Sequence, residues 1–132
     1  MRFLKPKLYS DSGAGPQLHG GRCACGYTFF PFQTYGCEKC GRVGDALQPA
    51  MLAAEGELVS SARVLLHKDP SLKAPFVVVT VKLDAGPVVN SLLAQDTTEP
   101  LPSGQRMKAQ WIEVSKTADG DPVFDLRFVV VH

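Results

Sequence analysis

Four cysteines are the residues of this sequence with the clearest chemical potential, because they occur as two close pairs. Cys23 and Cys25 form the first pair, and after eleven intervening residues Cys37 and Cys40 form the second. Two such pairs joined by a short hairpin can place four thiolates around one tetrahedral metal ion, typically zinc, and an S₄ site also accepts iron. Gly26 and Gly41 follow the pairs, where a tight turn needs a residue that tolerates positive φ.

Two disulfides or four unrelated thiols are the alternatives to a metal site. Residues 1–11 contain Arg2, Lys5 and Lys7 but no apolar core of a secretory signal, and no apolar run reaches the roughly 20 residues of a membrane helix. We therefore expect a cytoplasmic protein without a membrane segment, in which reduced thiols favour metal binding. A thioredoxin-like role for Cys37 and Cys40 lacks the βαβ pattern that such sites require.

Nothing else in the sequence has the pattern of a catalytic centre. With all four cysteines used as ligands, the metal keeps no open position for a reactive water and no cysteine remains as a nucleophile. His19, His67 and His132 stand apart, and no nucleophile elbow, phosphate loop or H-E-x-x-H motif is present. We expect a structural metal and no catalytic residue in this chain.

The elements that would position the cysteines are predicted to be β-strands. Residues 1–18 lack periodicity and are predicted to be an N-terminal arm, residues 19–43 a zinc ribbon, and residues 44–55 a linker that includes Pro49. Five strand-like runs then follow, with turn residues between them at 84–87 and 119–121, over 57–67, 76–83, 87–94, 106–115 and 123–131. Residues 56–132 are therefore predicted to form a small five-stranded barrel.

A phase slip interrupts the fourth run. Met107, Ala109 and Trp111 share one face, whereas Ile112 and Val114 follow the opposite parity. A β-bulge produces this change of phase, so we expect one there.

The hairpin between the cysteine pairs is unusually aromatic. A small ribbon cannot bury so many rings by itself, so they must pack on the rest of the chain or form a partner interface. Both interpretations stay open at this point for these residues: Tyr27, Phe29, Phe30, Phe32 and Tyr35.

Charge is unevenly distributed although the formal net charge is only +1. Residues 1–42 carry six basic and two acidic side chains, a balance of +4, and residues 43–132 carry eight basic and eleven acidic side chains, a balance of −3. Arg22, Lys39 and Arg42 flank the cysteines and could meet phosphate groups, although such charges are more often a solvated surface.

The order of these motifs resembles a known family. The sequence is similar to acyl-CoA-associated proteins that join a rubredoxin-like zinc ribbon to an OB-fold. The segments that carry the similarity are, in chain order, Cys23-Ala24-Cys25-Gly26 with Phe30-Pro31, Cys37-Glu38-Lys39-Cys40-Gly41, Gly56-Glu57-Leu58 and Leu83-Asp84-Ala85-Gly86. The first cysteine pair is one residue shorter than that family's usual C-x-x-C. The resemblance implies a mainly β fold, with an N-terminal rubredoxin-like ribbon followed by a five-stranded OB-fold barrel.

The resemblance also implies a function. Such proteins are accessory subunits of heteromeric enzymes that act on CoA thioesters, among them benzoylsuccinyl-CoA thiolase, and form hetero-oligomers such as heterotetramers. A thiolase-fold large subunit is the first expectation for the partner, and a hydratase or an aldolase is the alternative. The CoA thioester would be bound together with that partner. The candidate contacts to the CoA phosphates in this chain are Arg22, Lys39 and Arg42. A zinc ribbon with an OB barrel can instead bind single-stranded nucleic acid, which the acidic barrel disfavours.

Overall fold

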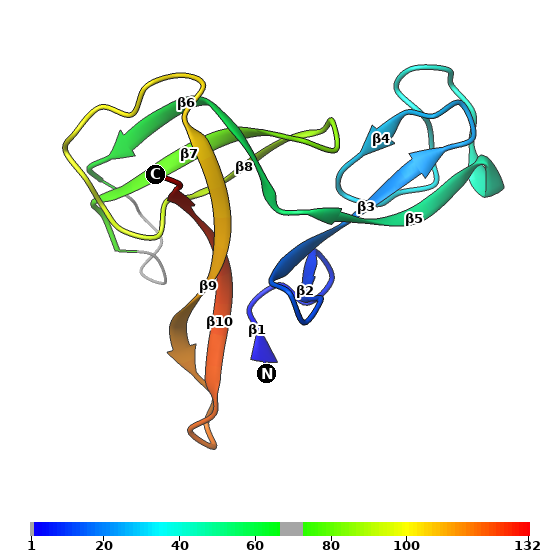
Figure 1. The fold of residues 1–132 in the computed structure, drawn as a ribbon. Coiled ribbons are helices and arrows are strands. Elements are labelled where there is room, and N and C mark those ends of the chain that lie inside the picture. The colour runs from blue at the N-terminus through cyan, green and yellow to red at the C-terminus, as the bar shows by residue number, and fades with distance from the viewer. Residues whose placement is uncertain (1, 67–72) are drawn as a thin grey trace.

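The computed structural model describes residues 2–66 and 73–132, and its regular structure is almost entirely β-strand. Figure 1 shows two lobes, one built around β3, β4 and β5 and the other around β6 to β10. The strand β5 (Leu47–Ala53) runs into β6 (Glu55–Val64) and connects the lobes, with only Ala54 between them. The mainly β fold predicted from the sequence is confirmed. No helix in the described ranges is long and apolar enough to cross a membrane.

The larger lobe is an OB-like barrel, as predicted. Its strands are β6, β7 (Phe76–Leu83), β8 (Val88–Leu92), β9 (Arg106–Lys116) and β10 (Pro122–Val130). They are neighbours in the order β10-β9-β6-β7-β8, and a parallel bridge from Leu93 to Phe128 brings the end of β8 to β10. This order curls the sheet into a partly open Greek-key barrel, the arrangement typical of OB-folds. Residue 67, the predicted end of the first strand, lies outside the described residues.

Alternation of side chains explains the barrel core. Along β7, Val77, Val79, Val81 and Leu83 are buried and the intervening residues are more exposed, because successive side chains point to opposite faces. Met107 and Ala109 on β9 and Phe128 on β10 complete the interior.

β9 contains a bulge, but it lies beyond the predicted phase slip, because Trp111 and Ile112 pair in regular register with Leu126 and Asp125. Val123 pairs with Ser115 and Phe124 pairs with Glu113, so Val114 is the extra residue.

The smaller lobe is a sheet organised around β3 (Pro16–Cys23). On one side β3 pairs with β5 over its length, and its remaining partners are β2 (Tyr9–Asp11) and β4 (Thr28–Phe29). Residues 44–55, which were expected to be a linker, contain a 3₁₀ turn, η1 (Gly44–Ala46), and the strand β5. Residues 1–18, which were expected to be an arm, contain β1 (Arg2–Phe3), β2 and the start of β3. The domain boundaries themselves stay predictions.

The N-terminal arm is held on the barrel by a buried polar contact. The hydroxyl of Tyr9, which is 4% exposed, donates a 2.6 Å hydrogen bond to Oδ1 of Asp125, which is 6% exposed. Arg127 Nε lies 3.2 Å from the other carboxylate oxygen. Burial and the bond to Asp125 both raise the pKa of Tyr9 above its ordinary value. Asp125 has the opposite parity to Leu126 and Phe128, which point into the barrel, and the arm explains why this carboxylate is nevertheless buried.

We expect Tyr9→Phe to destabilise the protein by about 1–3 kcal/mol, because Asp125 would stay buried after losing a hydrogen-bond donor. The matched control is Tyr35→Phe, since Tyr35 is 84% exposed. Urea denaturation at neutral pH measures both free energies of unfolding. Equal stability of the two variants would show that the Tyr9–Asp125 contact does not hold the arm.

Two glycines in β3 let the aromatic hairpin lie directly against the strand. A Cβ at Gly21 would lie 2.3 Å from Cζ of Phe29, and a Cβ at Gly20 would lie 2.5 Å from Phe29 O. Neither contact is tolerable, so the hairpin depends on both glycines in this strand.

Gly21→Ala should therefore destabilise the ribbon, at a cost of about 1–3 kcal/mol for the overpacked ring. Gly36→Ala is the control, because a Cβ there meets nothing within 4 Å. Denaturation of both variants with saturating zinc compares their stabilities. A stable Gly21→Ala protein with an unchanged Phe29 environment by NMR would contradict the close packing.

Candidate metal centre

Two different tight turns present the four cysteines. In the first turn, the Gly26 N–H donates to Cys23 O at 2.8 Å, and Gly26 has φ +96°. In the second turn, the Gly41 N–H donates to Cys37 O at 2.9 Å, and Gly41 has φ +79°. The first bond spans three residues and the second spans four, so the shorter cysteine spacing is accommodated by a tighter turn. Both glycines adopt the conformation expected of them.

The four sulfur atoms form a cluster that fits a tetrahedral metal ion. Cys23 Sγ lies 3.5 Å from Cys40 Sγ and Cys25 Sγ lies 3.8 Å from Cys37 Sγ, and all four lie within 4.8 Å of one another. A zinc ion with Zn–S bonds of about 2.3 Å requires sulfur–sulfur edges of about 3.8 Å. The cysteines are free thiols. The donor set and its spacing therefore suit a metal such as zinc.

The cluster lies at the edge of a very small apolar core. Cys23 and Cys37 are buried together with Phe29 and Leu47, whereas Cys25 is half-buried and Cys40 is exposed. So few buried side chains supply little hydrophobic stabilisation, and a structural metal commonly provides the rest in small ribbons.

The thiols differ in acidity. Burial raises the pKa of Cys37, but the backbone N–H groups of Cys40 and Lys39 and the neighbouring thiols outweigh it and lower that pKa to about 6. For Cys23, the backbone N–H of Cys25 lowers the pKa, whereas burial and the other three thiols raise it to about 11. Of these two thiols, Cys37 is therefore the one that loses its proton more readily.

The aromatic hairpin divides into packed and exposed rings. Phe29 is 6% exposed and lies between Tyr27 and Phe32, with ring centroids 6.5 and 6.3 Å away. The Tyr27 hydroxyl donates to Glu38 at 3.1 Å, and Phe30 packs against the barrel core. Tyr35 is 84% exposed. Packing within the chain therefore accounts for Phe29 and Phe30.

The three flanking cations are exposed and are not gathered at one point by any contact among the described residues. Arg22 lies on β3 and lines an open hollow of about 500 Å³ beside Cys23 and Gln48. Lys39 lies between the second pair of cysteines and Arg42 follows Gly41. His19 is not part of the metal cluster, because its ring nitrogens meet Lys7 O at 3.2 Å and Ser10 Oγ at 2.9 Å.

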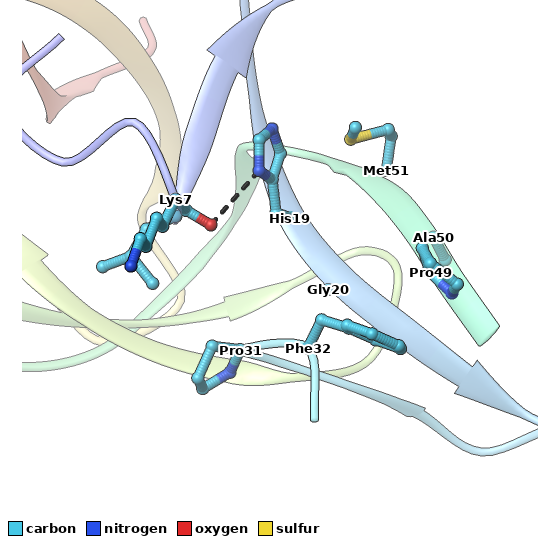
Figure 2. Close-up of a pocket in the computed structure, with 9 residues that line it drawn as sticks. Lys7, His19, Gly20, Pro31, Phe32, Pro49, Ala50 and Met51 are labelled. Carbon is cyan, nitrogen blue, oxygen red and sulfur yellow. Dashed lines mark hydrogen bonds between the residues drawn. The ribbon is translucent and has the colours of Figure 1, made fainter. Parts of the chain in front are cut away.

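Sequence reasoning missed a larger hollow on the outer face of the β3–β5 sheet. This ribbon groove has a volume of about 680 Å³, and Figure 2 shows Lys7 and Pro31 on one side of β3 and Pro49 and Met51 on the other. Its floor includes Gly20 and its wall includes Phe32. The available signal was the run of Pro49, Ala50 and Met51, which suggests a linker until β5 is known to be a strand.

We expect Cys37→Ser to abolish zinc binding and unfold the ribbon, because a serine hydroxyl is a poor replacement for the thiolate. Metal analysis of the purified chain and NMR of the Phe29 ring measure the two effects. The control is Glu38→Gln, which leaves all four sulfurs in place. Full zinc content and an intact ribbon in Cys37→Ser would contradict the metal site.

No protein-family model matches this sequence, and no curated protein matches it. Among solved structures, the chain is similar to one from a structure named "Ltp2-ChsH2(DUF35) aldolase", with a TM-score of 0.61 and 23% sequence identity. The match covers 83% of this chain and 84% of that chain. At this identity the likeness establishes a shared fold and nothing finer.

Proposed function

We propose that this protein is a non-catalytic accessory subunit of a heteromeric enzyme that makes or breaks a carbon–carbon bond in a CoA thioester. The observation that carries the proposal is the combination of a four-cysteine ribbon with an OB-like barrel. The similarity in fold to a chain of a structure named as an aldolase supports it. The motif order that resembles acyl-CoA-associated proteins supports the same assignment. The cytoplasm would be its compartment.

The metal centre supports a structural role for this subunit. Four cysteine ligands complete a tetrahedral shell, so a bound zinc ion would keep no position for substrate. The metal would instead hold the hairpin and β5 against β3, which keeps an outer surface available for a partner. The reacting groups would then belong to the large subunit.

The large subunit is an aldolase or a thiolase in this proposal. A thiolase was the first expectation from the sequence, and the name of the solved neighbour favours the aldolase alternative. Both reactions form or cleave a carbon–carbon bond beside a thioester carbonyl, so one type of accessory subunit suits either partner. A hydratase would share only the thioester substrate.

Single-stranded nucleic acid is the competing ligand, and the barrel surface disfavours it. Such binding uses aromatic platforms within a basic groove. Phe128 is 0% exposed, and Trp111 packs on Phe3 with ring centroids 4.5 Å apart, so neither ring is offered to a base. Residues 43–132 also carry a balance of −3 from eight basic and eleven acidic side chains.

Two groups of residues are proposed to serve the complex. Phe32 and Tyr35 are the aromatic side chains of the hairpin with the greatest exposure, and we assign them to the partner interface. Arg22, Lys39 and Arg42 are exposed and are assigned to the CoA phosphates, where charge-assisted contacts would form.

The proposal is tested by affinity purification from native cells, with mass spectrometry of proteins recovered in stoichiometric amounts. We expect an aldolase- or thiolase-type large subunit, whose activity on acyl-CoA falls when this chain is removed. Cys37→Ser should weaken recovery of that subunit, and Glu38→Gln should not. Recovery of nucleic acid, or of no CoA enzyme at low salt, would contradict the accessory role.

A further inference from the structure

We propose that the cysteine cluster is an oxidation-sensitive switch, in which a peroxide oxidises Cys40 and the oxidised Cys40 forms a disulfide with Cys23, so that a bound metal ion is released. The chemical step rests on the arrangement of the four thiols in this chain. Its effect on a partner rests in addition on the proposed function.

The four thiols are unequally accessible to an oxidant in solution. Cys40 is exposed and Cys25 is half-buried, whereas Cys23 and Cys37 are 2% and 5% exposed. The oxidation of a cysteine depends on its thiolate character and on its exposure. Cysteines that hold a metal are all thiolates, so exposure is what distinguishes the four. Cys40 is therefore expected to react first.

A second thiol lies within reach of Cys40. Cys23 Sγ is 3.5 Å from Cys40 Sγ, and a disulfide bond of about 2.0 Å requires the two sulfurs to approach by about 1.5 Å. Cys23 is held at the end of β3, whereas Cys40 lies in the exposed second turn, which can make this movement. An accessible cysteine beside a second, resolving cysteine is the arrangement of redox-sensing thiols.

The step balances with hydrogen peroxide as the oxidant. The Cys40 thiolate attacks one peroxide oxygen, so an S–O bond forms, the O–O bond breaks and hydroxide leaves. The Cys23 thiolate then attacks the sulfur of the resulting sulfenic acid, so the S–S bond forms, the S–O bond breaks and a second hydroxide leaves. The two thiolates lose two electrons, which reduce the peroxide, and the two hydroxides take up two protons from the buffer.

The disulfide leaves too few ligands for a structural metal ion. Cys25 and Cys37 remain as thiols, whereas such a site needs four protein ligands. These two cysteines stand at the two ends of the aromatic hairpin, and their sulfurs lie 3.8 Å apart. A metal that both of them hold closes the hairpin at its base. Oxidation of the other two cysteines therefore removes the link between the hairpin ends.

The released hairpin carries the side chains assigned to the partner interface. Phe32 and Tyr35 lie between Cys25 and Cys37, so they would be less well ordered after the metal is lost. Ordering them again on binding costs affinity. We expect the oxidised chain to bind the large subunit roughly tenfold more weakly, and reduction with zinc to restore the binding.

Titration of the zinc-loaded chain with hydrogen peroxide tests the chemistry. A chromogenic chelator measures the released zinc, and tandem mass spectrometry of a non-reduced tryptic digest identifies the disulfide, because cleavage after Lys39 separates Cys40 from the other cysteines. About one equivalent of peroxide should release about one zinc ion and give the Cys23–Cys40 disulfide, and dithiothreitol with zinc should reverse both. Zinc retained in excess peroxide, or a Cys37–Cys40 disulfide as the main product, would overturn the proposal.

The first oxidised residue is identified separately. Dimedone, which traps sulfenic acids, should label Cys40, and labelling mainly at Cys25 would contradict the assignment. Cys40→His keeps four metal ligands and removes the exposed thiol, so we expect peroxide to release zinc at least about tenfold more slowly than from the matched Cys25→His variant. Equal rates would contradict the role of Cys40. Zinc content shows that each variant is loaded, and the dimedone result decides the point where a variant does not load.

Binding of the reduced and the oxidised chain to the purified large subunit separates the two levels of the inference. Equal affinity of both forms would show that the switch does not regulate the complex. If the reduced, zinc-loaded chain binds no CoA enzyme, the proposed function fails, whereas zinc release and disulfide formation still decide the oxidation chemistry.

Discussion

The pairing of β3 with β5 is the interaction on which the rest of the structure depends. β3 ends at Cys23, the first of the four clustered cysteines, and β5 begins at Leu47, which is paired with Cys23 and buried beside it. The other end of β5 continues into the first strand of the barrel. A single antiparallel ladder therefore connects the cysteine cluster to the barrel core, and a disturbance at either end is transmitted through backbone hydrogen bonds.

The same ladder explains the glycines of β3. Gly20 and Gly21 leave room for Phe29 and Leu52, so the hairpin and β5 can both approach the strand closely. Larger residues at these positions would separate the aromatic stack from the sheet. The ribbon thus combines close packing, which supplies a few buried contacts, with a cluster of four cysteines that could bind a metal and fix the two turns. Neither is large enough to be sufficient alone in a lobe of this size.

Much of the barrel could be predicted from the sequence, because its strands alternate clearly and are separated by recognisable turns. Phe76–Leu83 is the clearest case. The cysteine spacing likewise predicted a cluster, because few arrangements of two close pairs are compatible with a hairpin. By contrast, the segment that forms β5 suggests a short helical turn or an extended linker, in which Pro49 would keep any helix short. An edge strand tolerates this proline, since its nitrogen faces solvent, and sequence alone does not show which strands are edges.

The burial of Asp125 was hidden for a related reason. A carboxylate on the outer face of a barrel strand is ordinarily solvated, and here it is covered by an arm more than a hundred residues earlier in the chain. Tyr9 and Asp125 are each unfavourable to bury alone, and together they satisfy one another. Long-range polar pairs of this kind leave no periodic signal in the sequence. They also fix the arm beside the ribbon groove, so Lys7 is held at the groove by a contact made on the opposite lobe.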